Sequence, residues 1–210
     1  MQRAVAGASR RAVVLALDFD QTLTVGDTLS AVAAAAAAGQ QPGRSRFQRC
    51  ADEYAKDLAA HEAGWRPVLD RQSRTVTSRG LLDTYLEALR PIEEASLRRV
   101  AAHGILAGAS RTDFARAGRN VELQAGAAAA INHFLQDPNF HVCIVSVNWS
   151  RDFIRGALEA GGVHLQGRLL HVYCNDPEFG ASTGLSTGAI QPRLVVASDK
   201  AAALVRFIDE

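Results

Sequence analysis

One short segment near the N-terminus constrains the fold more than any other part of the sequence. An apolar run, Ala12 to Leu17, leads directly into two carboxylates, Asp18 and Asp20, in the sequence LDFDQTLT. A short apolar run of this kind is typical of a buried parallel strand, because most helices are longer. Open parallel sheets bind their ligands beyond the carboxyl ends of the strands. The two acids are therefore predicted to share one face of a strand at a ligand site.

The C-terminal half of the sequence alternates between helix-like and strand-like segments. Apolar runs predict strands at His141–Val147 and Leu169–Cys174, and periodic patterns predict helices at Val121–Phe134, Trp149–Leu158 and Lys200–Ile208. Such alternation favours a parallel sheet with right-handed crossovers, so we expect an α/β, Rossmann-like core. The Gly-, Ser- and Thr-rich stretch 180–188 is predicted to be a hairpin or loop.

The segment between the first and second predicted strands is helical in character. An alanine-rich stretch begins at Asp27 and ends at Gly39, and helical patterns follow at Phe47–His61 and Gly80–Val100. No strand alternation is visible there. We therefore predict a helical cap over residues 27–119, inserted into a core formed by residues 1–26 and 120–210.

Composition narrows the function classes. Lys plus Arg is 23 and Asp plus Glu is 22, so the chain has no overall field to attract nucleic acid or an anionic membrane. The three cysteines show no CxxC spacing and are expected to be reduced. The basic N-terminus runs into Asp18 without a secretory apolar region, and no segment has the ~20 apolar residues of a membrane span. We expect a cytoplasmic protein without nucleic-acid or membrane partners.

The pattern of an apolar strand followed by DFDxTLT resembles the first signature of the haloacid dehalogenase superfamily. Taken alone, the two acids could simply cap the turn after the strand. The resemblance instead implies that Asp18 is a nucleophile that forms an aspartyl-phosphate, and that Asp20 is the acid and base. It also implies that Thr22 fixes the loop holding them.

The same resemblance implies a magnesium cofactor. A carboxylate oxygen of Asp18 and the main-chain carbonyl of Asp20 would be protein ligands. Mg²⁺ prefers six oxygen ligands and keeps several waters, so these two residues supply part of its shell and a further acid is expected.

The end of the second predicted strand carries a candidate phosphate-binding segment. Ser146, Val147 and Asn148 follow the apolar residues VCIV and precede a helix. A serine there is by itself an ordinary cap, but hydroxyl and amide groups at this place suit a phosphoryl oxygen. Its position after DFDxT and a helical insert resembles the second signature of the superfamily. The run SVNWS is also similar to a group of fungal dehalogenase-like hydrolases.

A lysine late in the chain completes the predicted catalytic set. Lys200, in SDKAAALVRF, begins the last predicted helix and could neutralise both Asp18 and an incoming phosphate. Its other interpretation is an exposed lysine in a first helical turn, which the helix dipole slightly disfavours. Arg193 is the substitute candidate.

The fourth signature of the superfamily, an acidic pair after a further strand, is not found before Glu210. Asp209 and Glu210 end a helix, and Asp176 precedes the lysine without a second acid at the expected spacing. We therefore expect weak metal binding and a sheet without a partner strand beside the first. Three explanations are open: a truncated gene model, a chain that was deliberately shortened, and a degenerate member of the superfamily that is retained for binding.

The position of the predicted cap, between the first two signatures, resembles the arrangement in phosphoserine phosphatase-like members. It implies a phosphoric monoester hydrolase acting on a small phosphorylated metabolite. Arg74, Arg79 and Arg111 could meet a second anionic group, although a solvated face is the simpler interpretation. The alternative is a binding protein without turnover. A dehalogenase or a phosphomutase ranks below both, and the oligomeric state is not predicted.

Overall fold

The computed structural model describes residues 12–37, 42–72, 79–165 and 170–209. Its centre is a parallel sheet of β1 (Val13–Leu17), β2 (Phe140–Val145) and β3 (Leu170–Tyr173), in the order β1-β2-β3. Leu17 lies opposite Ile144, so β1 and β2 end almost level. The three predicted strands are confirmed, except that Leu169 lies outside the described residues. In the described sheet, β1 pairs with β2 alone.

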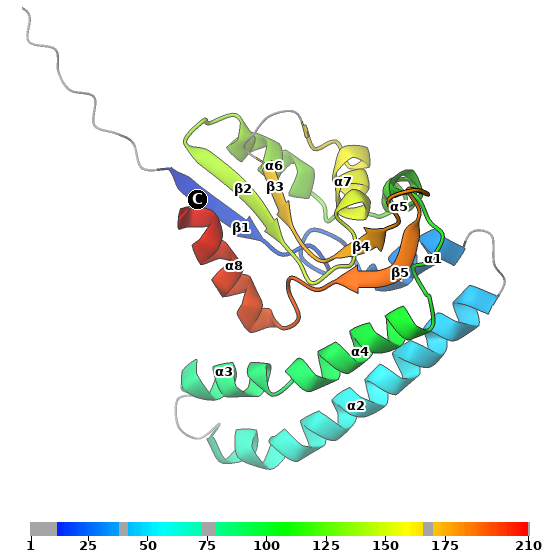
Figure 1. The fold of residues 1–210 in the computed structure, drawn as a ribbon. Helices are drawn as coiled ribbons and strands as arrows, with labels where there is room; N and C mark the ends of the chain where they lie inside the picture. Colours follow the sequence, from blue (N-terminus) through cyan, green and yellow to red (C-terminus); the bar gives the residue numbers. More distant parts are fainter. Residues whose placement is uncertain (1–11, 38–41, 73–78, 166–169, 210) are drawn as a thin grey trace, which may run out of the picture.

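Helices flank this sheet and form a separate layer below it (Figure 1). Their bounds are α1 (Leu29–Ala37), α2 (Pro42–Gln72), α3 (Arg79–Glu87), α4 (Arg90–Ala102), α5 (Arg111–Gly118), α6 (Ala127–Leu135), α7 (Arg151–Ala160) and α8 (Ala197–Asp209).

The central strand β2 is buried on both faces. Val142 and Ile144 belong to the main core, which contains Phe153 and Ile154 of α7 and Ile131 of α6. Cys143 and Val145 point to the other face, where they pack with Leu194 and with Ala203 of α8. Alternate residues of a strand face opposite sides of a sheet, so the apolar run of β2 fits a three-layer α/β/α core. The predicted α/β fold is confirmed.

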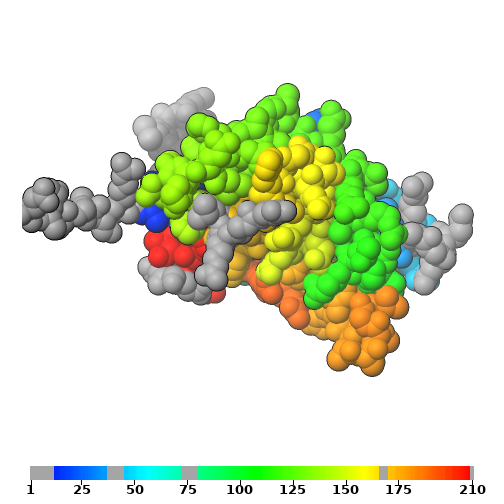
Figure 2. All heavy atoms as spheres, turned by 90° about the horizontal axis from the view of Figure 1, so that it is seen from above, coloured from blue at the N-terminus to red at the C-terminus, as the bar shows by residue number. Residues whose placement is uncertain are grey.

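Helices α5 and α7 approach each other unusually closely. A Cβ atom on Gly118 would lie 2.0 Å from the carbonyl oxygen of Phe153, and one on Gly156 would lie 2.1 Å from that of Ala115. Only glycine allows backbones this close. Figure 2 shows α5 and α7 side by side, with the β4–β5 hairpin next to them. Helix α5 thus packs directly on α7, one of the helices that flank the sheet.

A second, antiparallel pair consists of β4 (Asp176–Phe179) and β5 (Ser186–Gln191). The stretch 180–188, predicted to be a hairpin or loop, contains the turn of this hairpin and the first residues of β5. The hydroxyl of Ser186 donates to the carbonyl of Leu106 and accepts the amide N–H of Ala109 at 3.0 Å. The hairpin therefore fixes the segment that leads from α4 to α5.

The predicted helical insert contains helices α1 to α5 and no named strand among its described residues. Helices α2, α3 and α4 form the layer below the core in Figure 1. Arg99 of α4 forms ion pairs with Asp57 and Glu53 of α2. The boundaries 27 and 119 stay a prediction, since α5 contacts the core through α7.

One predicted helix begins later than expected. Residues 121–126 pair with the loop after β1: the amide N–H of Val25 donates to Glu122 at 3.1 Å, and that of Gln124 donates to Leu23 at 2.8 Å. These bonds use backbone groups that a helix would need, so α6 starts at Ala127.

The described residues include all three cysteines and most of the helical segments. Cys50, Cys143 and Cys174 are buried and free, as predicted. No described helix is both long and apolar enough to cross a membrane. The basic N-terminal residues Arg3, Arg10 and Arg11 lie outside the described residues.

Candidate active site

The loop after β1 turns so that Asp18 and Asp20 face away from the core. Phe19 between them is fully buried, and its carbonyl accepts the amide N–H of Leu23 at 2.9 Å. Gln21 has a φ of 57°, the left-handed value that a tight turn needs. The buried hydroxyl of Thr24 donates to the carbonyl of Gly26 at 2.6 Å and accepts the amide of Gln21 at 3.1 Å.

Thr22, the residue predicted to fix this loop, is exposed. Its backbone N–H donates to the carbonyl of Phe19 at 3.3 Å. The side-chain hydrogen bonds of the loop come from Thr24, two residues later.

Asp18 and Lys200 are brought together from opposite ends of the sequence. The Nζ atom of Lys200 donates to Oδ2 of Asp18 at 2.6 Å, across 182 residues of chain. The other carboxylate oxygen of Asp18 accepts the amide N–H of Phe19 at 2.8 Å. The Asp18 side chain is still 40% exposed, so it is charge-neutralised and also reachable by a ligand.

Asp20 is held by three hydrogen bonds. Its Oδ1 atom accepts the amide N–H and the hydroxyl of Thr28, at 2.9 and 2.6 Å. Its Oδ2 atom accepts the side-chain amide of Asn148 at 3.2 Å, and the same amide nitrogen donates to the hydroxyl of Thr28 at 2.9 Å. The predicted site residues Asp20 and Asn148 are therefore in direct contact.

The segment after β2 lies at the same edge of the sheet. Ser146 is fully buried, and its hydroxyl accepts the amide N–H of Asn148 at 3.1 Å. The carbonyl of Val147 accepts the side-chain amide of Asn175 at 2.9 Å. Asn175 also accepts the amide of Leu194 at 2.9 Å, which ties the strand end to the segment before α8.

The arginines considered from sequence lie elsewhere or outside description. Arg193 lies 3.5 Å from Asp176, so it does not take the place of Lys200 beside Asp18. Arg111 pairs with Asp152 at 3.0 Å. Arg74 lies outside the described residues, and of Arg79 only the backbone, at the start of α3, is described.

The donor set beside Asp18 fits a magnesium ion in part. Among the described residues, no group of three or more His, Cys, Asp or Glu side chains is arranged to hold a metal. Asp18 offers a partly exposed carboxylate, and Asp20 a main-chain carbonyl. Mg²⁺ commonly keeps waters and phosphate oxygens in its shell, so two protein oxygens can serve when a phosphate is bound. Of Asp209 only the backbone, at the end of α8, is described.

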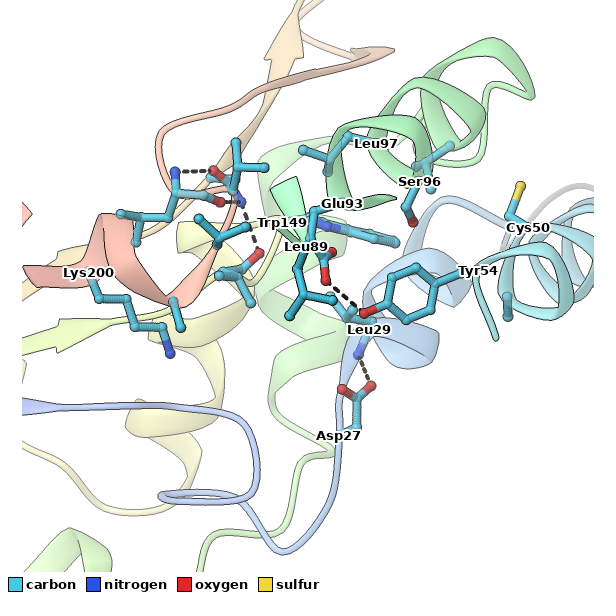
Figure 3. Close-up of a pocket in the computed structure, with 18 of the residues that line it drawn as sticks. Asp27, Leu29, Cys50, Tyr54, Leu89, Glu93, Ser96, Leu97, Trp149 and Lys200 are labelled. Carbon is cyan, nitrogen blue, oxygen red and sulfur yellow. Dashed lines mark hydrogen bonds between the residues drawn. The ribbon is translucent and has the colours of Figure 1, made fainter. Parts of the chain in front are cut away.

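A pocket of about 460 Å³ lies between Lys200, one of the predicted catalytic residues, and the helical layer. Lys200 and Val147 line it on the core side, and Tyr54 of α2 and Glu93 of α4 line it on the other side (Figure 3). The hydroxyl of Tyr54 donates to Oε1 of Glu93 at 2.7 Å. Burial raises the pKa of Glu93, and this hydrogen bond only partly offsets it. Burial also raises the pKa of Tyr54, and its bond to Glu93 adds to that rise.

Sequence reasoning missed several residues of the site. Thr28 lies directly before α1, in the predicted helical insert, and Asn175 belongs to no motif. Tyr54 and Glu93 lie 39 residues apart on different helices. A run of acids and hydroxyls after the first strand could have pointed to Thr28, whereas nothing local marks the Tyr54–Glu93 pair.

Comparison with known proteins gives two kinds of relatives. No family model matches the sequence. A CTO1 family protein of Schizosaccharomyces pombe is 31% identical over 185 residues, which cover 84% of this chain and 61% of that protein. The mitochondrial bifunctional TH2 protein of Arabidopsis thaliana is 28% identical over 209 residues, which cover 92% of this chain and 33% of that protein. The chain thus spans less than two thirds of the length of either relative.

Solved structures share the fold. A phosphoserine phosphatase with an analogue of the phospho-aspartyl intermediate matches with a TM-score of 0.52 at 15% identity, over 96% of this chain and 72% of its own. A substrate-bound phosphoserine phosphatase matches with a TM-score of 0.50 at 16% identity, over the same shares. A protein of unknown function from Bordetella pertussis Tohama I also has a TM-score of 0.50, at 20% identity, over 95% of this chain and 74% of its own.

Proposed function

This chain has the fold of the phosphoserine phosphatases, as its resemblance to the haloacid dehalogenase superfamily predicts, and we propose that it is a phosphoric monoester hydrolase that works through an aspartyl-phosphate. The observation that carries the proposal is the contact between Lys200 and Asp18, with 2.6 Å between Nζ and Oδ2. A fold alone does not define an activity, whereas this contact joins the two residues expected to act on a phosphate.

Asp18 is suited to be the nucleophile. Its carboxylate is 40% exposed at the end of β1, and Lys200 offsets the repulsion between this carboxylate and an anionic phosphate. In the proposed first step, an Asp18 oxygen bonds to phosphorus while the bond between phosphorus and the alcohol oxygen breaks. The phosphoryl group is then carried by Asp18.

Asp20 is suited to transfer the protons. In the first step, a protonated Asp20 gives its proton to the departing alcohol oxygen. In the second step, water attacks the phosphorus of the aspartyl-phosphate, Asp20 takes a proton from that water, and Asp18 is released with inorganic phosphate. The bonds from Thr28 and Asn148 hold the Asp20 carboxylate in one orientation for both transfers.

Two further groups of atoms support phosphate binding. Ser146, Val147 and Asn148 form the segment after β2, and we propose that their polar groups bind phosphoryl oxygens, together with Thr22, an exposed residue of the loop after β1. The Asp18 carboxylate and the main-chain carbonyl of Asp20 would hold Mg²⁺, whose charge would stabilise negative charge on the phosphoryl group when it is bound.

The test is hydrolysis of a generic aryl phosphate with and without Mg²⁺. We expect magnesium-dependent turnover that falls by at least about 10³-fold in Asp18→Asn, which keeps the shape but removes the nucleophile. Asp83→Asn makes the same chemical change at an exposed position of α3 and is expected to keep full turnover. Equal turnover in the wild type and Asp18→Asn would contradict the proposal.

A second candidate is a phosphate-binding protein without turnover. It is favoured by the described residues, which contain no group of three acid, His or Cys side chains placed for a metal. The same assay separates the two, because a binding protein would show no turnover although a phosphate ester binds. For either function, we propose a small phosphorylated metabolite as ligand and the cytoplasm as location.

A further inference from the structure

The pocket beside Lys200 is placed to hold the alcohol part of a phosphate ester. Lys200, Val147 and residues 195–197 line its catalytic end, and side chains of α2 and α4 line its far end. In Figure 3, Lys200 lies on one side of this space and the Tyr54–Glu93 pair on the other. Because Lys200 both lines this pocket and contacts Asp18 at 2.6 Å, a phosphoryl group bound at Asp18 would lie beside the catalytic end, and the rest of its ester could extend into the pocket.

Most of the pocket wall is apolar or aromatic. Leu89 and Leu97 come from the α4 region, while Phe47 of α2 packs edge-on against Trp149, with ring centroids 6.4 Å apart. Such a wall favours an alcohol with an apolar or aromatic body over a strongly hydrated polyol, since each apolar surface buried gains free energy.

Away from Lys200, the charged side chains that line the pocket are all acidic. The charged residues that line it are Asp27, Glu93 and Lys200, and the Lys200 ammonium is already paired with Asp18. Asp27 is the more exposed acid and accepts the amide N–H of Leu29 at 3.0 Å. Glu93 is half-buried and accepts the Tyr54 hydroxyl. No arginine lines the described pocket.

Glu93 and Asp27 therefore have no basic partner among the residues that line the pocket, apart from Lys200. Burial raises the pKa of both Glu93 and Asp27, and a hydrogen bond only partly offsets the rise in each case. A cationic group entering the pocket would stabilise these carboxylates, and aromatic faces such as those of Tyr54 and Trp149 also attract cations. An anionic group would be repelled.

Resting on the proposed phosphatase function, we propose that the pocket selects phosphate monoesters whose alcohol combines an apolar or aromatic body with a positively charged group, and rejects alcohols that carry a carboxylate. Phosphoserine carries a carboxylate as well as an ammonium group, so the substrate class differs from that of the phosphoserine phosphatases with which the chain shares its fold. Glu93 is the specificity-determining residue of this proposal.

Three matched aryl phosphates test the proposal. They carry aminomethyl, methyl or carboxymethyl groups at the para position, so that charge varies while size and leaving group change little. We expect kcat/KM to fall in that order, by about tenfold or more between the cationic and the anionic ester. Glu93→Gln is expected to reduce this ratio several-fold.

The matched control is Glu94→Gln, one residue along α4. It removes the same charge, but Glu94 does not line the pocket and instead faces Arg98 at 3.6 Å. The ratio between the cationic and anionic esters should be unchanged in this variant. An equal fall in Glu94→Gln would mean that long-range charge, rather than Glu93 in the pocket, sets the preference, and would overturn the proposal.

A binding measurement separates this inference from the proposed function. Calorimetry with non-hydrolysable phosphonate analogues of the cationic and anionic esters measures the preference without turnover. Tighter binding of the cationic analogue, weakened in Glu93→Gln, supports the pocket proposal even if no ester is hydrolysed. Turnover of the neutral ester with equal or reversed charge preference overturns the pocket proposal and leaves the phosphatase function standing.

Discussion

Arg90, at the start of α4, binds Asp199, the residue directly before Lys200, with 2.8 Å between Nη2 and Oδ1. Asp199 also accepts the amide N–H groups of Val195 and Val196, at 2.8 and 3.1 Å. These amides belong to the two residues directly before α8, so one carboxylate both fixes the entry to the helix that carries Lys200 and joins that helix to the helical layer.

The Asp199 contacts predict a pH-dependent loss of stability in Asp199→Asn. Burial opposes ionisation of Asp199, but the bonds from Arg90, Val195 and Val196 outweigh it and lower its pKa below 3.8. An acid with a lowered pKa stabilises the fold above its unfolded pKa and loses that effect as the pH falls through its folded pKa. We expect Asp199→Asn to lower the free energy of unfolding by about 1 kcal/mol at pH 7.

Urea unfolding at a series of pH values measures this effect. The difference between wild type and Asp199→Asn should shrink as the pH falls below about 4, the ordinary pKa of an aspartate. Asp83→Asn, at an exposed position of α3, should leave stability within about 0.5 kcal/mol of the wild type. A difference that is constant with pH would mean that Asp199 acts through shape and not through its charge.

The hydroxyl of Thr28 is predicted to matter for catalysis. It donates to Asp20 at 2.6 Å and accepts from Asn148 at 2.9 Å, so Thr28→Val disconnects these groups while keeping the side-chain shape. We expect kcat to fall about tenfold or more with little change in KM, because proton transfer depends on the orientation of Asp20. Steady-state kinetics on an aryl phosphate measure it.

Thr28→Ser is the matched variant because it restores the hydroxyl. It should recover most of the kcat lost in Thr28→Val. If both variants lost the same activity, the methyl group of Thr28, which is 95% buried with the rest of the residue, would be the important part.

Two Gly→Ala substitutions are predicted to have opposite effects, one where α5 and α7 are in contact and one at an exposed position of α2. At Gly156 the added Cβ would lie 2.1 Å from the carbonyl oxygen of Ala115, so the helices must separate. We expect a loss of about 1 to 3 kcal/mol in the free energy of unfolding. At Gly64, inside α2, the added Cβ meets nothing within 4 Å, and we expect a gain of about 0.5 to 1 kcal/mol. Thermal and urea unfolding compare the two, and a neutral Gly156→Ala would contradict the close packing.

Local patterns were sufficient to predict the sheet and the residues that meet at its edge. The apolar runs around Leu15, Ile144 and Val172 are confirmed as parallel strands in one sheet. Since parallel strands end at a common edge, Asp20 and Asn148 could be expected to come together there. Lys200 reaches that edge because α8 packs on the face of β2 that carries Cys143 and Val145.

Contacts between distant helices had no comparable signal. The Tyr54–Glu93 and Arg90–Asp199 pairs join residues 39 and 109 apart, and neither spacing corresponds to a helical or strand period. The close approach at Gly118 and Gly156 is likewise a property of two packed helices and not of either sequence alone. The apolar pattern of residues 121–134 predicts one helix, but the backbone of Glu122 and Gln124 bonds to the loop after β1, a partner that the pattern does not show.

Burial of Glu93 predicts that Glu93→Gln stabilises the protein at neutral pH. The pKa of Glu93 is raised above 4.5 by burial, so the native state holds its proton at a pH where the unfolded state has released it. Above both pKa values the buried charge lowers stability, and this penalty disappears as the pH falls to the unfolded value. Glutamine keeps an oxygen to accept the Tyr54 hydroxyl. We expect a gain of roughly 0.5 to 1 kcal/mol at pH 8 and none near pH 4, measured by urea unfolding.

A loss of stability at pH 8 would mean that the charged Tyr54–Glu93 bond outweighs desolvation. A stabilised Glu93→Gln that also loses its preference for cationic esters would identify Glu93 as a residue kept for binding at the expense of stability.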